Sequence, residues 1–446
     1  MRDLVLALVM VGVIPASFMR PWFGALAWVW ISIMNPHKLT YGFMYSAPLA
    51  QLIALAVIAG LFFRRDHRSF PIAAPMVWMI LFTLWMCITY PFSLVDTSAN
   101  REQLEKVLKI MLMNAVVLIP LHTRRHVDFL IGAMVLSIGY YGVKGGLFAI
   151  ATGGSYHVRG PESTFIGPNN EIGLAIVMTI PLLYYFALRA KTTWLRLAVW
   201  LAIFLSAVGA VATHSRGALL AIVAMAGVLF LRSQQRSRLI LPLLLTGAFI
   251  IAFMPDKWFD RMETIRDHKS DASAMGRINA WILAWNVARS HFFGGGFTLE
   301  TQELFERYSP SFEFVAVAHS LYFQVLGHHG FVGLFLFLGM CWATLRTCWW
   351  IHANSTAPED KHLARMAEVS FVGFGVGGAF LSLAYFDGPY YLMVALVILR
   401  YKVLGGAKVG LPQSKGLPSL GADALAARAE PTLTAAQEDP VAARRR

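Results

Sequence analysis

A histidine and a small group of cationic side chains have types and positions in this sequence that suit phosphate chemistry. A guanidinium group can bind two phosphate oxygens at once, and a neutral imidazole can accept a proton from a hydroxyl group. The histidine is His319, and the cations are Arg159, Arg216, Arg277 and Lys144. Together they predict a site for a phosphorylated substrate with a base beside it.

The three arginines lie in segments that join long apolar runs. Arg216 lies in the short segment 214–218, and Arg159 lies in the longer segment 152–170, where Asn169 could cap the following helix. Arg277 lies near the start of a predicted amphipathic helix, where it and the helix N-terminus could bind phosphate together. The apolar residues of that helix recur at i, i+3, i+4 and i+7: Ile278, Trp281, Ile282 and Trp285.

Each cation also has a structural interpretation. An arginine can extend to lipid headgroups or pair with a nearby acid, and Lys144, inside an apolar run, could form a buried ion pair. Three arginines on one side of a membrane, however, favour an anionic partner.

His319 lies where a long polar loop meets the next apolar run, and Ser320 and Tyr322 follow it as possible supporting residues, as does Ser215 beside Arg216. A metal site built with His328 and His329 is an alternative, but the spacing matches no zinc motif. We find no nucleotide-binding or Ser-His-Asp motif either. The sequence predicts neither a metal nor a cofactor.

The composition indicates a membrane protein, because 57% of residues are hydrophobic and only 14% are charged. Many apolar runs approach or reach the ~20 residues needed to cross a bilayer as a helix. They include 238–254, 366–385 and 388–402, with a short turn at Asp387-Gly388 between the last two. The formal net charge of +13 does not indicate nucleic acid, because basic pairs such as Arg64-Arg65 and Arg124-Arg125 lie in short loops, where they orient membrane proteins. The prediction is an all-α, polytopic transmembrane helical bundle.

The positive-inside rule predicts about twelve transmembrane helices in a bacterial inner membrane, with the arginines and His319 on the periplasmic side. The predicted parts are N-terminal transmembrane helices (1–254), a large periplasmic loop domain with amphipathic helices (255–318), C-terminal transmembrane helices (319–403) and a disordered cytoplasmic tail (404–446). Residues 1–35 contain prolines and are interpreted as one net crossing, which puts both termini in the cytoplasm. Two full crossings with the N-terminus outside is the alternative.

Several of these segments resemble the O-antigen ligase family of the ligase–polymerase membrane superfamily. They are Ser215-Arg216-Gly217, Gly276-Arg277, Gly294-Gly295-Gly296 and His319-Ser320. The resemblance covers about residues 1–403 and is closest to the exosortase-associated O-glycosylation ligase branch. It implies about twelve membrane helices with a large periplasmic loop, an essential histidine at His319, and essential arginines at Arg216, Arg159 and Arg277.

The resemblance also implies the reaction. The donor would be a glycan carried on undecaprenyl pyrophosphate, the acceptor a sugar hydroxyl of the lipid A core, and no metal or nucleotide would be needed. Membrane lipids would surround the protein, and nucleic acid would not be a partner. A polymerase and a protein O-oligosaccharyltransferase of the same superfamily are alternatives, and a polysaccharide transporter or flippase is an alternative from a different class.

Overall fold

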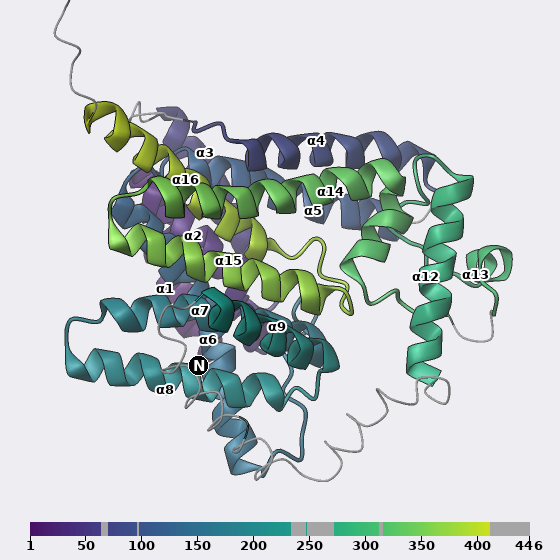
Figure 1. The fold of residues 1–446 in the computed structure, drawn as a ribbon, viewed down its shortest axis with the longest axis horizontal. Coiled ribbons are helices and arrows are strands. Elements are labelled where there is room, and N and C mark those ends of the chain that lie inside the picture. The colour runs from purple at the N-terminus through teal and green to yellow at the C-terminus, as the bar shows by residue number, and fades with distance from the viewer. Residues whose placement is uncertain (64–69, 96–97, 233–246, 248–271, 312–314, 411–446) are drawn as a thin grey trace, which may run out of the picture. The chain divides into compact units, whose positions relative to one another are not determined.

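The computed structural model is all-helical over the residues that it describes, which are 1–63, 70–95, 98–232, 247, 272–311 and 315–410 (Figure 1). This part contains 14 α-helices and no strand. The chain divides into a unit of residues 1–403 and a second of residues 404–446. The helices are α1 (Arg2–Met19), α2 (Pro21–Met34), α3 (Leu49–Phe63), α4 (Ala74–Thr89), α5 (Ser98–Leu118), α6 (Arg124–Ala151), α7 (Asn169–Arg189), α8 (Thr193–Val211), α9 (Arg216–Arg232), α12 (Ala272–Ser290), α13 (Gln302–Tyr308), α14 (Leu321–Asn354), α15 (Pro358–Gly378) and α16 (Asp387–Gly410).

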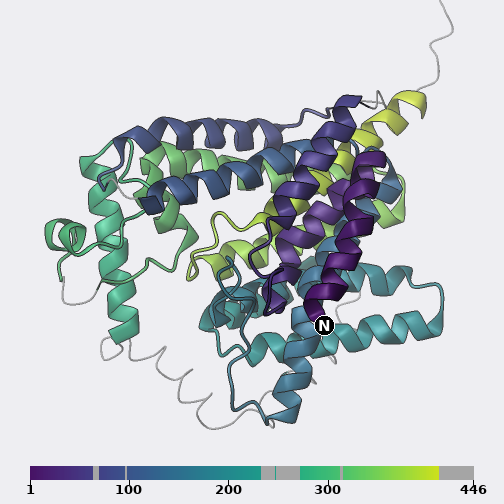
Figure 2. The same ribbon diagram turned by 180° about the vertical axis from the view of Figure 1, so that it is seen from behind.

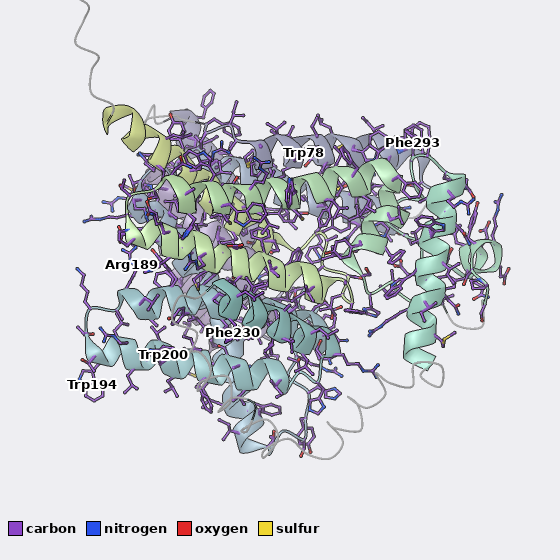
Figure 3. All side chains as sticks on the ribbon, viewed as in Figure 1. Trp78, Arg189, Trp194, Trp200, Phe230 and Phe293 are labelled. Carbon is purple, nitrogen blue, oxygen red and sulfur yellow. The ribbon has the colours of Figure 1, made fainter. Side chains whose placement is uncertain are left out.

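Six of the described helices are long and apolar enough to cross a membrane: α1, α4, α6, α7, α8 and α14. The helices α2, α3 and α9 are apolar but shorter. Several helices also expose large apolar side chains, as lipid contact requires, and Trp194 and Trp200 of α8 are 81% and 43% exposed (Figure 3). The chain is therefore a multi-pass membrane protein, whereas the count of about twelve crossings stays a prediction. The predicted crossing at 238–254 lies outside the described residues.

The first two helices form an antiparallel hairpin, which corrects the interpretation of residues 1–35 as one net crossing. Oδ1 of Asp3, at the start of α1, accepts hydrogen bonds from the backbone N–H groups of Gly42 and Met44, both 3.1 Å away. Those residues follow α2, so the chain returns to the side from which it starts. Figure 2 shows α1, α2 and α3 side by side. The geometry fits the alternative of two passes.

The helices α7 and α16 lie deep in the core. In α16 every residue from Pro389 to Leu399 is buried, and α7 is buried over 78% of its apolar window. The helix α15 packs against α7, α9 and α14. The ends of α7 and α15 carry charged groups, which are described below.

A glycine turn joins the 291–301 loop to a break in α14. Gly330 has φ 67° and ψ −172°, which interrupts the helix and frees backbone carbonyl groups of the preceding turn. The N–H groups of Gly295 and Gly296 donate to the carbonyls of Gly327 and His328, at 2.8 and 3.1 Å. The sharp turn predicted at residues 294–296 is confirmed, since Gly294 and Gly296 have φ of 77° and 88°.

The connection between α15 and α16 differs from the prediction of a helix over 366–385 and a short turn at Asp387-Gly388. The helix α15 ends at Gly378, and residues 379–386 form an irregular segment in which Leu381, Leu383 and Phe386 are at most 2% exposed. Irregular backbone is tolerated at membrane depth where protein surrounds it. An apolar composition therefore did not imply a helix here.

The predicted start of the disordered tail needs correction as well. The helix α16 continues to Gly410, so the first residues after 403 are helical. Residues 411–446 lie outside the described residues.

Candidate functional site

Arg216 is the first residue of α9 and follows a tight turn after α8, as the sequence predicted. The hydroxyl of Ser215 accepts a hydrogen bond from the N–H of Ala218 at 3.2 Å, which caps α9. His214 has a left-handed φ of 55°, and its Nε2 lies 3.0 Å from the carbonyl oxygen of Gly154. A backbone conformation of this kind costs roughly 1–3 kcal/mol in a non-glycine residue and is often found at functional sites.

Arg277 lies in the second turn of α12, which corrects its predicted position at the helix start, because α12 begins at Ala272. The apolar stripe predicted from Ile278 to Trp285 is not the side of the helix that is buried most. The small residues Ala280 and Ala284 are 3% and 1% exposed, whereas Trp285 is 45% exposed. Their size lets α12 pack closely against α14, which leaves the aromatic stripe beside the site.

Arg216 and Arg277 line one cavity although they are 61 positions apart in the sequence. We call it the arginine cavity, and its lining is Asn170, His214, Arg216, Gly217, Arg277, Phe380 and Leu381. No carboxylate is among these lining residues. Two guanidinium groups and the N-terminus of α9 therefore face one small space, which suits an anion.

His319 lies directly before α14, and a carboxylate stands beside it. Its Nδ1 is 3.6 Å from Oε1 of Glu171, a buried residue of α7. His319 has a left-handed φ of 42° and its side chain is 33% exposed. The imidazole is thus held between a buried carboxylate and open space. Glu171 was not predicted, because the sequence gave no sign that α7 would approach His319.

Two connections place His319 next to the arginine cavity. Nε1 of Trp281, one turn after Arg277, donates to the carbonyl oxygen of Ala318 at 2.6 Å. Glu171, which contacts His319, directly follows Asn170 of the cavity lining. The imidazole is consequently tied to the cavity through both α12 and α7.

Glu300 is a second carboxylate in this region that the sequence analysis missed. It is exposed as a residue, lines a small cavity with Ala318, Gln324 and His328, and interacts electrostatically with His319. Burial raises the pKa of the Glu300 carboxyl. Its position in a loop far from His319 in sequence gave no signal that could have identified it.

The remaining predicted residues do not line the cavity. Arg159 and Lys144 are exposed and contribute nothing to the lining. Asn169 is the first residue of α7 and not its cap; its Nδ2 donates instead to the carbonyl oxygen of Thr213 at 2.8 Å. Ser320 is buried before α14 and makes no capping hydrogen bond with its side chain.

Tyr322 lies on an apolar groove between α14 and α15. Its hydroxyl donates to the carbonyl oxygen of Gly375 at 2.8 Å, and its ring lines a groove of about 460 Å³. Phe380 lines both this groove and the arginine cavity. An apolar chain in the groove would therefore end near the two guanidinium groups.

His328 and His329 are buried and form hydrogen bonds inside the protein core. Nδ1 of His328 and Nε2 of His329 each lie 2.9 Å from the hydroxyl of Tyr385, and Thr89 lies 2.8 Å from Nδ1 of His329. Within the described part of the chain, no three histidine, cysteine or acidic side chains are grouped to hold a metal ion.

Comparison with known protein families divides the chain near α8. Residues 1–192 match a family of unknown function, and this part contains Glu171 and Asn170. The comparison with curated proteins gave no match. Residues 201–338, which contain Arg216, Arg277 and His319, match the O-antigen ligase family, and this match supports a place for the chain in the ligase–polymerase membrane superfamily.

Proposed function

We propose that the protein is a membrane ligase that transfers an O-antigen-type glycan from undecaprenyl pyrophosphate to a sugar hydroxyl of the lipid A core. The observation that carries this proposal is the arginine cavity with His319 beside it. The reaction takes place at the periplasmic face of the bacterial inner membrane. The family match supports a membrane ligase, and the cavity supports a pyrophosphate donor.

The arginine cavity binds the pyrophosphate of the donor. Arg216 and Arg277 neutralise the negative charge that grows on the leaving group as the glycosyl bond breaks, which stabilises the transition state. The polyprenyl chain lies in the apolar groove between α14 and α15, and Phe380 marks where it meets the cavity. Pyrophosphate leaves readily as an anion, so the leaving group needs no general acid.

His319 is the general base. Its imidazole accepts the proton of the acceptor hydroxyl while the hydroxyl oxygen bonds to the anomeric carbon and the bond from that carbon to the pyrophosphate oxygen breaks. Displacement in one step inverts the anomeric configuration. Glu171 lies on the Nδ1 side, so it favours the tautomer that leaves Nε2 to take the proton, and it stabilises the imidazolium that forms.

No metal and no cofactor has a role in this mechanism. Lys144 and Arg159, which do not line the cavity, would attract the anionic donor and the phosphorylated lipids around it.

Reconstitution of the full-length protein tests the proposal. Liposomes without an ion gradient would contain the protein, a glycan on undecaprenyl pyrophosphate and lipid A-core, with EDTA present. We expect glycan on the lipid A-core with inverted anomeric configuration, and free undecaprenyl pyrophosphate in equal amount. Longer glycans on the lipid carrier would identify a polymerase instead, and movement of the donor across the bilayer without transfer would identify a flippase.

A further inference from the structure

A second cleft, of about 460 Å³, lies between α2 and α5, and we call it the α2–α5 cleft. Its volume lies within the range typical of sites for small molecules. The lining comes from α2, α3, α5 and three connecting segments: Trp28, Ser32, Ile33, Asn35, His37, Ala47, Pro48, Leu49, Ala50, Gln51, Glu102, Glu105, Lys106, Lys109, Ile110, Ser163, Thr164, Phe165, Ile166, Phe386 and Asp387.

The charges in this lining nearly cancel, unlike those of the arginine cavity. It contains three carboxylates and two ammonium groups. Lys109 lies 3.7 Å from Glu105, and the charges of Lys106 and Asp387 attract each other. Burial lowers the pKa of His37, which keeps that ring neutral at neutral pH. The cleft therefore offers no net attraction to a phosphate.

The uncharged polar groups of the cleft suit a ligand with many hydroxyl groups. Ser32, Asn35 and Thr164 each donate a side-chain hydrogen bond to a backbone carbonyl. Their oxygens can still accept hydrogen bonds, and Gln51 and Ser163 can donate and accept them, as sugar hydroxyls do. Trp28 and Phe386, which are 5% and 2% exposed, form the apolar base of the cleft. Nζ of Lys106 lies 3.8 Å from the centre of the Phe165 ring, so a cation already covers that ring.

Two chain segments join this cleft to the arginine cavity. The segment before α7 contributes Ile166 to the cleft and Asn170 to the cavity, and the segment after α15 contributes Phe386 to the cleft and Leu381 to the cavity. Four or five residues span at most about 13–18 Å. A short oligosaccharide can bridge any distance up to this limit.

We propose that the α2–α5 cleft binds an uncharged, hydroxyl-rich saccharide unit of a substrate whose reacting end lies at the arginine cavity. The proposal rests on the proposed function, since it assigns the cleft to the glycan of that reaction. Such a saccharide has two sources, the donor glycan and the acceptor core, and the experiment below separates them.

The experiment measures binding of three soluble probes to the full-length protein in nanodiscs by calorimetric titration. The probes are the donor glycan released from its carrier by mild acid, the deacylated core oligosaccharide, and inorganic pyrophosphate. Gln51→Trp would fill the cleft from α3, and Leu52→Trp is the matched control, because Leu52 is exposed on the same helix but outside the lining. Glu102→Ala removes a carboxylate from the cleft without adding bulk. Glu162→Ala is its control, because Glu162 is exposed and lies outside the lining.

We expect Gln51→Trp to weaken binding of one saccharide by at least about tenfold, and Glu102→Ala to weaken the same one, while both controls and the affinity for pyrophosphate stay unchanged. The saccharide whose binding is weakened shows whether the cleft binds the donor glycan or the acceptor core. The proposal is overturned if the wild-type protein binds neither saccharide, or if both cleft variants bind them as the controls do. Failure of pyrophosphate to bind the wild-type protein would count against the proposed function alone.

Discussion

The two ends of α7 and α15 carry positive charges in opposite ways. At one end, Arg124 lies 2.7 Å from Asp128 and 2.6 Å from Asp360, and Arg189 lies 3.1 Å from Glu359 (Figure 3). At the other end, the arginine cavity contains two guanidinium groups and no carboxylate in its lining. A helix of 21 residues such as α7 is roughly 30 Å long, so the two ends are about one bilayer core apart.

The difference teaches how to distinguish structural from functional cations in a membrane protein. Paired arginines hold helices together, because each charge is neutralised within the fold. Arginines that line the same cavity bring several N–H donors to one small space, where an anionic substrate can bind them. The sequence could not make this distinction, since it shows all these residues only as basic positions near apolar runs.

Removing the base at the cavity end has the largest expected effect. We expect His319→Ala to lower the rate of glycan transfer by about 10²–10⁴-fold while donor binding persists, because general base catalysis contributes that much. Transfer to lipid A-core in liposomes measures the rate. His362→Ala, on the exposed surface of α15, is the control and should be fully active. Unchanged transfer by His319→Ala would refute the base role.

Removing a cavity arginine comes next. We expect Arg216→Ala to weaken pyrophosphate binding by about 100-fold, and Arg216→Lys to restore little of it, because lysine cannot bind two oxygens in the same planar geometry. Calorimetric titration with pyrophosphate measures this. Lys191→Ala, exposed between α7 and α8 and outside the cavity lining, should bind pyrophosphate normally. A loss of stability equal to the loss of binding would make Arg216 a structural residue.

Removing a paired arginine at the opposite end should show the reverse. We expect Arg124→Ala to lower the free energy of unfolding by about 2 kcal/mol, because Asp128 and Asp360 would lose the cation between them in a half-buried place. Pyrophosphate binding should be retained. Thermal unfolding in detergent measures the stability. A variant that is as stable as the wild type but no longer binds pyrophosphate would contradict a structural role for Arg124.

Glu171 sharpens the comparison, because it is a carboxylate at the cavity end that pairs with a histidine and not with an arginine. We expect Glu171→Gln to lower the maximal transfer rate about tenfold with little change in donor KM. Glu171→Asp should recover part of the rate. A change in donor KM alone would argue for a role in binding.

The smallest effect concerns Glu300. Burial raises the pKa of its carboxyl, so the folded state favours the protonated form. Stability from this group is present at low pH and is lost as the pH rises through the raised pKa. At a pH above the raised pKa, we expect Glu300→Gln to have a higher free energy of unfolding than the wild type, by less than about 1 kcal/mol. Below that pKa the two proteins should be equally stable. Melting temperatures over a pH series test this.

The sequence predicted much of the fold and part of the site. Runs of about 20 apolar residues identified most described helices, and the Arg216 turn and the glycine turn were confirmed because their residue types restrict the backbone. The buried segment 379–386 was missed, since apolar composition alone does not distinguish a helix from irregular backbone inside protein. Arg216, Arg277 and His319 were predicted together, whereas Glu171 and Glu300 required knowledge of tertiary contacts.

The break in α14 at Gly330 affects how the sequence of the 291–301 loop can change during evolution. The loop is attached to α14 through N–H and carbonyl groups at positions 295, 296, 327 and 328, which belong to the main chain. Attachment of this kind does not depend on the identity of side chains elsewhere in the loop. The loop can therefore exchange its outward residues to suit a new acceptor while its anchorage to the membrane helices stays the same.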